Sequence, residues 1–192
     1  IGACDWSSDV CSSDLDPAEA LHAAEAGELG ESGPESFAEQ LEAAEVDVVV
    51  ECIPQNIRSG EPALGHHRAA LEAGVHVVTA NKTPIALGYR DLRHRAAKGG
   101  ACFRFEATVL DGLPLFAFVA QLHGQRVVRA RGVLNATSSV VLEAVGNGAS
   151  RSRGLARAQA QGIAEADVVL DLDGWDAAAK AAVLANVWMD GS

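Results

Sequence analysis

Two alternating patterns of hydrophobic and polar positions run through the first part of the chain. Short runs of β-branched residues predict buried strands, and the amphipathic stretches between them predict helices. We expect strands over 46–52, 75–80 and 101–109, and helices over 16–27, 35–45, 61–74 and 83–100. This strand–helix order favours an α/β fold with a parallel, doubly wound sheet of the Rossmann type.

After Gly112 the pattern changes, because apolar helices become more frequent. We expect helices over 113–124, 137–148, 152–162 and 174–189, and one long strand over 125–136. The change predicts a boundary near Phe105 between a nucleotide-binding half and a second α/β half.

Composition and charge exclude several classes of function. Of the 192 residues, 48% are hydrophobic and 21% are charged, which is the balance of a folded globular protein. The formal net charge of −11 argues against a nucleic-acid partner, because phosphate binding needs clustered Lys and Arg. No apolar run approaches the roughly 20 residues that span a bilayer, so we expect no membrane partner.

Residues 1–15 are set aside from the fold prediction. Asp5 to Leu15 reads DWSSDVCSSDL, which resembles the in-frame translation of a common sequencing-library adapter. A genuine Ser/Asp-rich terminus is the alternative. The cysteines outside this segment, Cys52 and Cys102, have no CxxC or metal-ligand spacing. They predict buried thiols in a reducing compartment, and hence a cytoplasmic protein.

A cluster of acidic residues precedes a lysine near the end of the chain. It comprises Glu165, Asp167, Asp171, Asp173 and Asp176, and is followed by Lys180. Asp176 and Lys180 are four residues apart on a predicted helix, so they share a face and can pair. A solvated loop with Asp173 as the helix N-cap is the alternative on pattern alone. A calcium loop fails, because Val169 and Lys180 would occupy positions that need oxygen ligands.

Two polar segments, TANKTP (79–84) and ECIPQN (51–56), follow predicted strands. Ligands of open α/β sheets bind beyond the carboxyl ends of the strands, so Ile53, Asn81 and Lys82 are candidate cofactor contacts. An exposed loop lysine is the alternative for Lys82.

Two further segments contain potential metal ligands. The turn EATVLDGLP (106–114) offers oxygen ligands for a hard cation, or is a plain strand-to-helix turn. His66 and His67 lie on a predicted surface helix and point apart, which argues against a metal site there.

Taken together, these segments resemble the homoserine dehydrogenase family. VDVVVE, HVVTANKTPIA, FEATVLDGLPLF, RGVLNATSS and AQAQGIAEADVVLDLDGWDAAAKAA occur in the family's order and spacing. The resemblance implies that residues 16–104 are the C-terminal part of an NAD(P)-binding domain. It also implies that residues 105–192 are a catalytic and dimerisation domain, incomplete at its C-terminus.

The resemblance implies an activity as well. It is the reversible, NAD- or NADP-dependent interconversion of L-homoserine and L-aspartate 4-semialdehyde, in threonine and methionine biosynthesis, by a homodimer. Lys180 would transfer the proton, with Asp176 beside it. Substrate binding would fall to Glu165, Asp171 and Asp176. Cofactor contacts would come from Ile53, Asn81, Lys82, Gly132 and Thr137, with Asn135 in the same turn as the last two. A sodium ion would bind at Glu106, Val109, Asp111 and Leu113.

Some features depart from the family pattern. Ala136 and Ser139 replace a usual Gly or Ser and a usual Asn, and a methyl group at position 136 could crowd the cofactor. No GxGxxG motif is present to hold a pyrophosphate, and we expect that element upstream of Asp16. The alternative function is therefore an inactive fragment that keeps only the dimerisation and substrate half.

A phosphorylating semialdehyde dehydrogenase is disfavoured, because neither Cys52 nor Cys102 has an evident base nearby in sequence.

Overall fold

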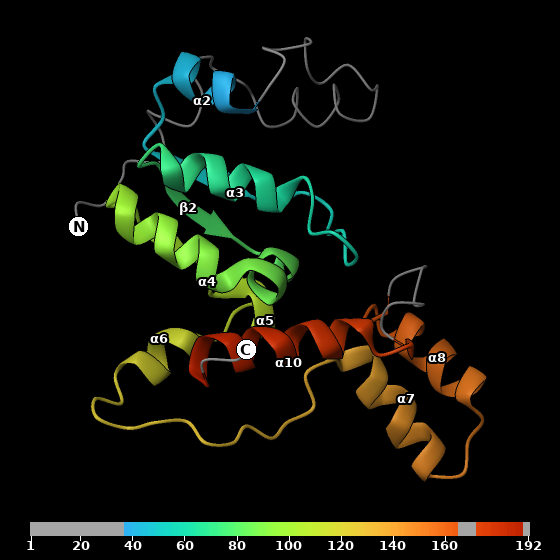
Figure 1. Cartoon of the computed structure of the whole chain (residues 1–192). Coiled ribbons are helices and arrows are strands. Elements are labelled where there is room, and N and C mark those ends of the chain that lie inside the picture. The colour runs from blue at the N-terminus through green and yellow to red at the C-terminus, as the bar shows by residue number, and fades with distance from the viewer. Residues whose placement is uncertain (1–36, 165–171, 190–192) are drawn as a thin grey trace, which may run out of the picture.

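The computed structural model describes residues 37–164 and 172–189 of the chain. Its elements (Figure 1) are α2 (Phe37–Ala44), β1 (Val48–Glu51), α3 (Ala63–Glu72), β2 (His76–Thr79), α4 (Lys82–Gly99), β3 (Phe103–Arg104), α5 (Ala107–Leu110), α6 (Leu115–Ala120), α7 (Ala136–Gly146), α8 (Arg151–Ala160) and α10 (Trp175–Trp188). None of the described helices is both long and apolar enough to cross a bilayer.

The three strands form a parallel sheet in the order β1–β2–β3, as the alternating pattern predicted. Val49 pairs with Val77, and Val77 pairs with Phe103, which places these three side chains on one face. Parallel neighbours need a crossover connection, and α3 and α4 provide the two crossovers. The two helices lie side by side over this face (Figure 1). The α/β fold with a parallel sheet is therefore confirmed.

The described helices cover one face of this sheet. Val77, Leu71 and Leu92 are completely buried in the first core cluster, between the sheet and α3 and α4. The alternate residues Val50 and Val78 remain 52% and 40% exposed. The β-branched runs predicted strands buried throughout, so this part of the prediction was wrong. The physical reason is that every second side chain of a strand points to the opposite face, and none of the described helices packs on that face.

The long strand predicted over 125–136 does not form in the described structure. Residues 125–135 belong to no helix or strand, and Val128 and Val133 are 77% and 69% exposed. A strand needs a neighbour to pair its backbone N–H and C=O groups, and no described strand lies beside this segment. The strand predicted over 101–109 is also shorter, because α5 begins at Ala107.

Helix α10 packs across α4 and α5 and joins the two parts of the chain. Ile85 of α4, Val109 of α5 and Val183 of α10 form the centre of a second core cluster. The Asn186 side-chain amide also donates to the carbonyl oxygens of Ile85 and Ala86, at 3.0 and 2.9 Å. This docking fixes the start of α10 relative to the start of α4.

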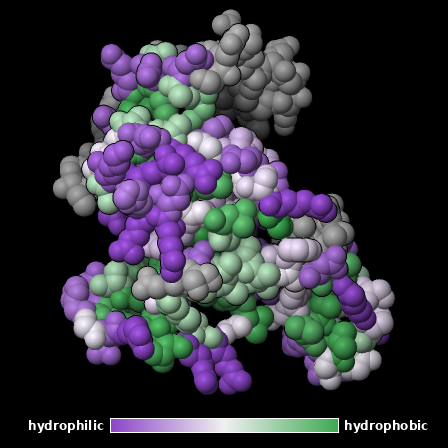
Figure 2. All heavy atoms as spheres, viewed as in Figure 1, coloured by the Kyte–Doolittle hydropathy of each residue, from purple (hydrophilic) through white to green (hydrophobic). Residues whose placement is uncertain are grey.

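The surface differs between the two parts. Hydrophilic side chains dominate the outer side of α3 and α4, whereas hydrophobic patches lie over the helices below them (Figure 2). Phe118 of α6 and Leu142 of α7 are 63% and 65% exposed. Cys52 and Cys102 are free and exposed, so the prediction of buried thiols was wrong. Both lie just outside a strand, at opposite ends of the sheet, where none of the described helices covers them.

Candidate active site

The side chains of Lys82, Asp176 and Lys180 meet where the N-termini of α4 and α10 come together. Lys82 is the first residue of α4, and Asp176 lies in the first turn of α10. The Lys82 Nζ atom lies 2.9 Å from Asp176 Oδ1, and the Lys180 Nζ atom lies 3.2 Å from Asp176 Oδ2. The predicted pairing of Asp176 with Lys180 is therefore confirmed, and Lys82 is a second partner that the helical spacing could not reveal.

Two groups from the turn before α7 complete this cluster. The Asn135 amide donates to Asp176 Oδ2 at 3.0 Å, and the Lys180 ammonium donates to the Leu134 carbonyl oxygen at 2.7 Å. Asn135 is also the N-cap of α7, because its side-chain oxygen accepts from the Ser138 N–H at 2.7 Å. The turn expected to face the nicotinamide therefore contacts the Asp176 cluster through Asn135.

The cluster is largely shielded from water and keeps its carboxylate ionised. The side chains of Lys82, Asp176 and Lys180 are only 16%, 9% and 15% exposed. Burial, the largest influence, acts to raise the pKa of Asp176. The hydrogen bonds from Asn135 and Lys82 and the charges of Lys82 and Lys180 outweigh it, so this pKa lies below its ordinary value.

The charge balance of this cluster suits proton transfer to an oxygen atom. Two ammonium groups share one carboxylate, which leaves an excess of positive charge in a partly dehydrated place. A lysine held by a carboxylate and a carbonyl oxygen is fixed in direction, yet it keeps a proton that it can donate. Such an arrangement stabilises negative charge that develops on a bound substrate oxygen.

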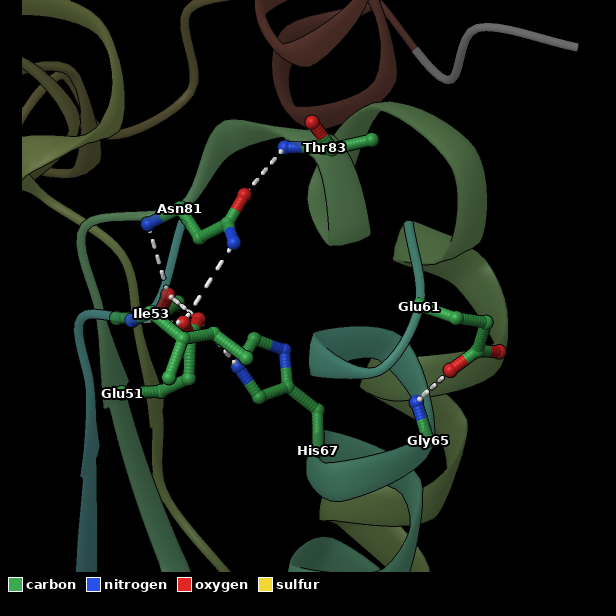
Figure 3. Close-up of polar contacts among 8 residues, drawn as sticks. Glu51, Ile53, Glu61, Gly65, His67, Asn81 and Thr83 are labelled. Atoms are coloured by element: carbon green, nitrogen blue, oxygen red, sulfur yellow. Dashed lines mark hydrogen bonds and ion pairs between the residues drawn. The ribbon is translucent and has the colours of Figure 1, made fainter. Parts of the chain in front are cut away.

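A second buried carboxylate, Glu51, lies at the carboxyl end of β1, where the sequence singled out only Ile53. Glu51 Oε2 accepts from the Thr79 hydroxyl at 2.6 Å and lies 3.1 Å from His67 Nε2. Glu51 Oε1 accepts from the Ile53 N–H at 2.8 Å. Figure 3 shows His67 reaching this carboxylate from α3 and Asn81 lying between it and Thr83.

The pKa of Glu51 also lies below its ordinary value. Burial is the largest influence and acts to raise this pKa, but the hydrogen bonds from His67, Thr79 and the Ile53 N–H outweigh it. His67 is completely buried, so its expected place on a helix surface was wrong. No group of three or more His, Cys, Asp or Glu in the described part could hold a metal ion.

The remaining candidate cofactor residues do not gather at the Asp176 cluster. Asn81 is the buried N-cap of α4, and its side-chain oxygen accepts from the Thr83 N–H at 3.2 Å. Gly132 is exposed in the segment before α7. Thr137 is buried in the first turn of α7, and its hydroxyl lies 3.5 Å from the Ile163 carbonyl oxygen. Glu165 and Asp171 lie outside the described residues.

The four candidate cation ligands lie in one turn around α5, but their side chains do not converge. The Glu106 carboxylate accepts from the backbone N–H of Phe116 at 2.7 Å and therefore caps the start of α6. Val109 is buried in the second core cluster, whereas Asp111 and Leu113 are exposed. Any oxygen ligands from this turn would have to come mainly from its backbone carbonyl groups.

Sequence reasoning missed Glu51, His67 and Gln55 as parts of the site. The Gln55 amide oxygen accepts from the Lys82 ammonium at 3.3 Å. The sequence did contain one indication for Glu51. It directly follows three valines of a predicted buried strand, so its carboxylate is expected at the end of the sheet or in the interior. Its partnership with Thr79 depends on the strand register, which pairs these two positions.

Asp173 and Ala136 lie next to the N-termini of α10 and α7. The N-cap of α10 is Gly174, with φ of 83°, and Asp173 is exposed, so the alternative prediction of Asp173 as N-cap was wrong. Glycine suits this position because residues with a Cβ atom rarely adopt positive φ. Ala136, whose methyl group was expected to crowd a cofactor, is exposed at the first position of α7.

Comparison with known families accounts for most of the chain. Residues 8–106 match the family model for the homoserine dehydrogenase NAD binding domain, and residues 114–192 match the model for homoserine dehydrogenase. The homoserine dehydrogenase of Sulfurisphaera tokodaii is 37% identical over 146 residues, covering 76% of this chain and 48% of the relative. The NAD(+)-dependent homoserine dehydrogenase of Pseudomonas canavaninivorans is 39% identical, covering 75% and 41%. The chain thus spans about half the length of these relatives, or less.

Solved structures show the same similarity in three dimensions. A hyperthermophilic archaeal homoserine dehydrogenase in complex with NADPH has a TM-score of 0.75 and 30% identity, covering 91% of this chain and 56% of that one. The homoserine dehydrogenase of Thermoplasma acidophilum has a TM-score of 0.73 and 32% identity, covering 92% and 55%. The resemblance seen in the sequence motifs therefore extends to the arrangement of the helices and strands.

Proposed function

The chain belongs to the homoserine dehydrogenase family, and on this premise we propose that it carries the proton-transfer centre of that activity. The proposed reaction is the reversible, NAD(P)-dependent interconversion of L-homoserine and L-aspartate 4-semialdehyde, in threonine and methionine biosynthesis. The observation that carries the proposal is the shielded cluster of Lys82, Asp176 and Lys180. It unites residues from the two separately matched segments, 8–106 and 114–192.

In the reducing direction, Lys180 donates a proton to the aldehyde oxygen while the aldehyde carbon becomes the alcohol carbon. A bound nicotinamide supplies the hydride for this step and accepts one in the reverse direction. The deprotonated Lys180 amine then takes a proton from solvent. Asp176 and the Leu134 carbonyl oxygen hold the ammonium in one direction. Lys82 offsets the Asp176 charge, so that the site keeps a net attraction for the developing alkoxide.

The acidic residues that the sequence singled out are the proposed ligands of the substrate. We propose that Glu165 binds the α-ammonium group of the substrate and that Asp171 and Asp176 assist, because carboxylates pair with ammonium groups. Asp176 is the described member of this set, and its lowered pKa keeps it ionised at neutral pH.

The cofactor proposal rests on the NAD binding domain match and on the NADPH complex of a structural neighbour. Ile53, Asn81, Lys82, Gly132 and Thr137 are the proposed contacts. Because the side chains of Asn81 and Thr137 are engaged within the chain, these two residues would contact the cofactor through their backbones. Lys82 is the proposed contact that brings a charged side chain.

We also propose that the turn of Glu106, Val109, Asp111 and Leu113 binds a sodium ion. The fit depends on backbone carbonyl oxygens, because the Glu106 carboxylate already caps α6. For organisation, we propose an NAD(P)-binding part over 16–104, a catalytic part over 105–192, and a homodimer. The free, exposed Cys52 and Cys102 support a reducing, cytoplasmic location.

Equilibrium binding of NADPH to the 192-residue chain, followed by a rate assay with L-homoserine and NAD or NADP, tests this function. Saturable binding and homoserine-dependent cofactor reduction are the expected results. Binding of homoserine without binding of either cofactor would favour the alternative, an inactive fragment that keeps the dimerisation and substrate half. Failure to bind both ligands would contradict the proposed function.

A further inference from the structure

The buried Glu51 carboxylate is hydrogen-bonded to two segments that lie next to Lys82. One is the loop after β1, and the other is the turn between β2 and α4. On one side, Glu51 Oε1 accepts from the Ile53 N–H at 2.8 Å and so holds the loop after β1. That loop carries Gln55, whose amide oxygen lies 3.3 Å from the Lys82 ammonium. Glu51 thereby acts on the loop that contributes one of the Lys82 partners.

On the other side, Glu51 holds the turn between β2 and α4 through Thr79. The Thr79 hydroxyl donates to Glu51 Oε2 at 2.6 Å and accepts from the Asn81 N–H at 2.9 Å. The Asn81 side chain in turn accepts from the Thr83 N–H, as drawn in Figure 3. The residues on both sides of Lys82 are therefore fixed by buried hydrogen bonds, and the Asn81 amide lies 3.5 Å from Glu51.

Burial gives this network its rigidity. Glu51, Thr79 and Asn81 are 4%, 2% and 6% exposed, so water cannot replace a lost partner without a change in packing. His67 Nε2 must carry a proton to donate, because an ionised carboxylate can only accept. The Nδ1 atom of His67 has no hydrogen-bond partner among the described residues, so the ring is oriented by its contact with Glu51 and by edge packing against Phe103.

We propose that Glu51, His67 and Thr79 are positioning residues, which set the Lys82 ammonium against Asp176 through the Asn81 turn and the Gln55 loop. Through Asp176 they also act on Lys180, although none of the three contacts the Asp176 cluster. The meaning of this arrangement for catalysis rests on the proposed function. The positional coupling itself is a property of the chain alone.

The test measures the pKa of the Asp176 carboxyl group by ¹³C NMR in the 192-residue chain. Lys82→Met removes the ammonium and defines the full upward shift of this pKa, because Lys82 acts to lower it. Thr79→Val keeps the shape and β-branching of the side chain but leaves Asn81 without its hydroxyl acceptor. We expect Thr79→Val to raise the Asp176 pKa by a large part of the Lys82→Met shift.

Two controls separate positioning from general loss of stability. Thr79→Ser keeps the hydroxyl group and should restore the Asp176 pKa to the value of the unmodified chain. Val77→Ala lies two residues earlier on the same covered face and weakens the core, but should leave the pKa unchanged. If Thr79→Val does not fold, Glu51→Gln takes its place. The Glu51 donors use both carboxylate oxygens, whereas a Gln side chain has one acceptor oxygen, so some of these hydrogen bonds are lost.

The inference is overturned if Lys82→Met raises the Asp176 pKa while Thr79→Val, or Glu51→Gln in its place, leaves it at its original value. It is also overturned if Val77→Ala raises this pKa as much as Thr79→Val does. Neither result depends on cofactor or substrate. A failure of the proposed function, seen as missing NADPH and homoserine binding, is therefore a separate outcome.

Discussion

The chain builds two buried carboxylate centres from similar local parts, and they differ in the charge of their partners. Asn81 before α4 and Asn135 before α7 each cap a helix with the side-chain oxygen, while the side-chain nitrogen faces a carboxylate. That carboxylate is Glu51 in the first case and Asp176 in the second, at 3.5 and 3.0 Å. Both sites use an Asn-x-Thr sequence at the start of the helix.

The difference lies in what else surrounds each carboxylate. Glu51 is held by the Thr79 hydroxyl group, the Ile53 backbone N–H and the His67 imidazole. Asp176 is held by two lysines, whose ammonium groups bring excess positive charge. The comparison shows that hydrogen-bond donors surround Glu51, whereas two ammonium groups concentrate positive charge around Asp176, where we propose the proton transfer.

The largest expected effect comes from Lys180. The chain has three lysines, Lys82, Lys98 and Lys180. In a steady-state assay of homoserine oxidation, Lys180→Ala should lower turnover by about 10²–10⁴-fold, the usual contribution of a positioned proton donor. The Michaelis constant should change far less. Lys98→Ala, on the exposed last turn of α4, is the matched control and should leave turnover unchanged. Unchanged turnover in Lys180→Ala would remove it from this role.

The next effect is on the free energy of unfolding, and it distinguishes the shielded Asp176 cluster from the exposed ion pairs of Asp91. Asp176→Ala leaves two shielded ammonium groups without their shared carboxylate and should cost about 3–5 kcal/mol in the free energy of unfolding. Asp91 also pairs with two basic residues, Arg68 and Arg95, but its side chain is 37% exposed. Asp91→Ala should therefore cost no more than about 1 kcal/mol per pair. Urea unfolding measures the free energy of unfolding of both variants. Equal losses would contradict the expected difference between the shielded and the exposed carboxylate.

A smaller effect is the loss of unfolding free energy at low pH. The ordinary pKa values of Asp176 and Glu51 are 3.8 and 4.5, and both are lowered in the folded chain. Their stabilisation is fully present above these ordinary values and is lost as pH falls through the lower, folded-state values. The difference in unfolding free energy between the unmodified chain and Asp176→Asn should therefore narrow below about pH 4. A difference that stays constant down to acid unfolding would argue against a lowered Asp176 pKa.

The smallest effect compares the two capping asparagines. Serine also caps helices, so Asn81→Ser and Asn135→Ser should each change the unfolding free energy by less than about 1 kcal/mol. Asn135→Ser should nevertheless raise the Asp176 pKa, because the amide hydrogen bond acts to lower it. Asn81→Ser should leave the Glu51 pKa nearly unchanged, because its amide lies at 3.5 Å and other donors remain. Thermal unfolding and ¹³C NMR titration measure the two quantities.

The sequence by itself determined the features that depend on neighbouring residues. The β-branched runs and the helices between them predicted the parallel sheet, because local periodicity is set by backbone geometry. The four-residue spacing predicted the Asp176–Lys180 pair for the same reason. The family motifs predicted the homoserine dehydrogenase family, which the matches over 8–106 and 114–192 confirm.

Only the tertiary structure decided which distant groups share a site. The pairing of Lys82 with Asp176 exists because α10 docks on α4 through Ile85 and Asn186, a contact that no local pattern encodes. Burial of His67 depends on the face that α3 turns to the sheet. The segment 125–135 shows the reverse case, where strand-forming residues lack a described partner strand. Local preference sets what a segment can form, and packing against other segments decides what it does form.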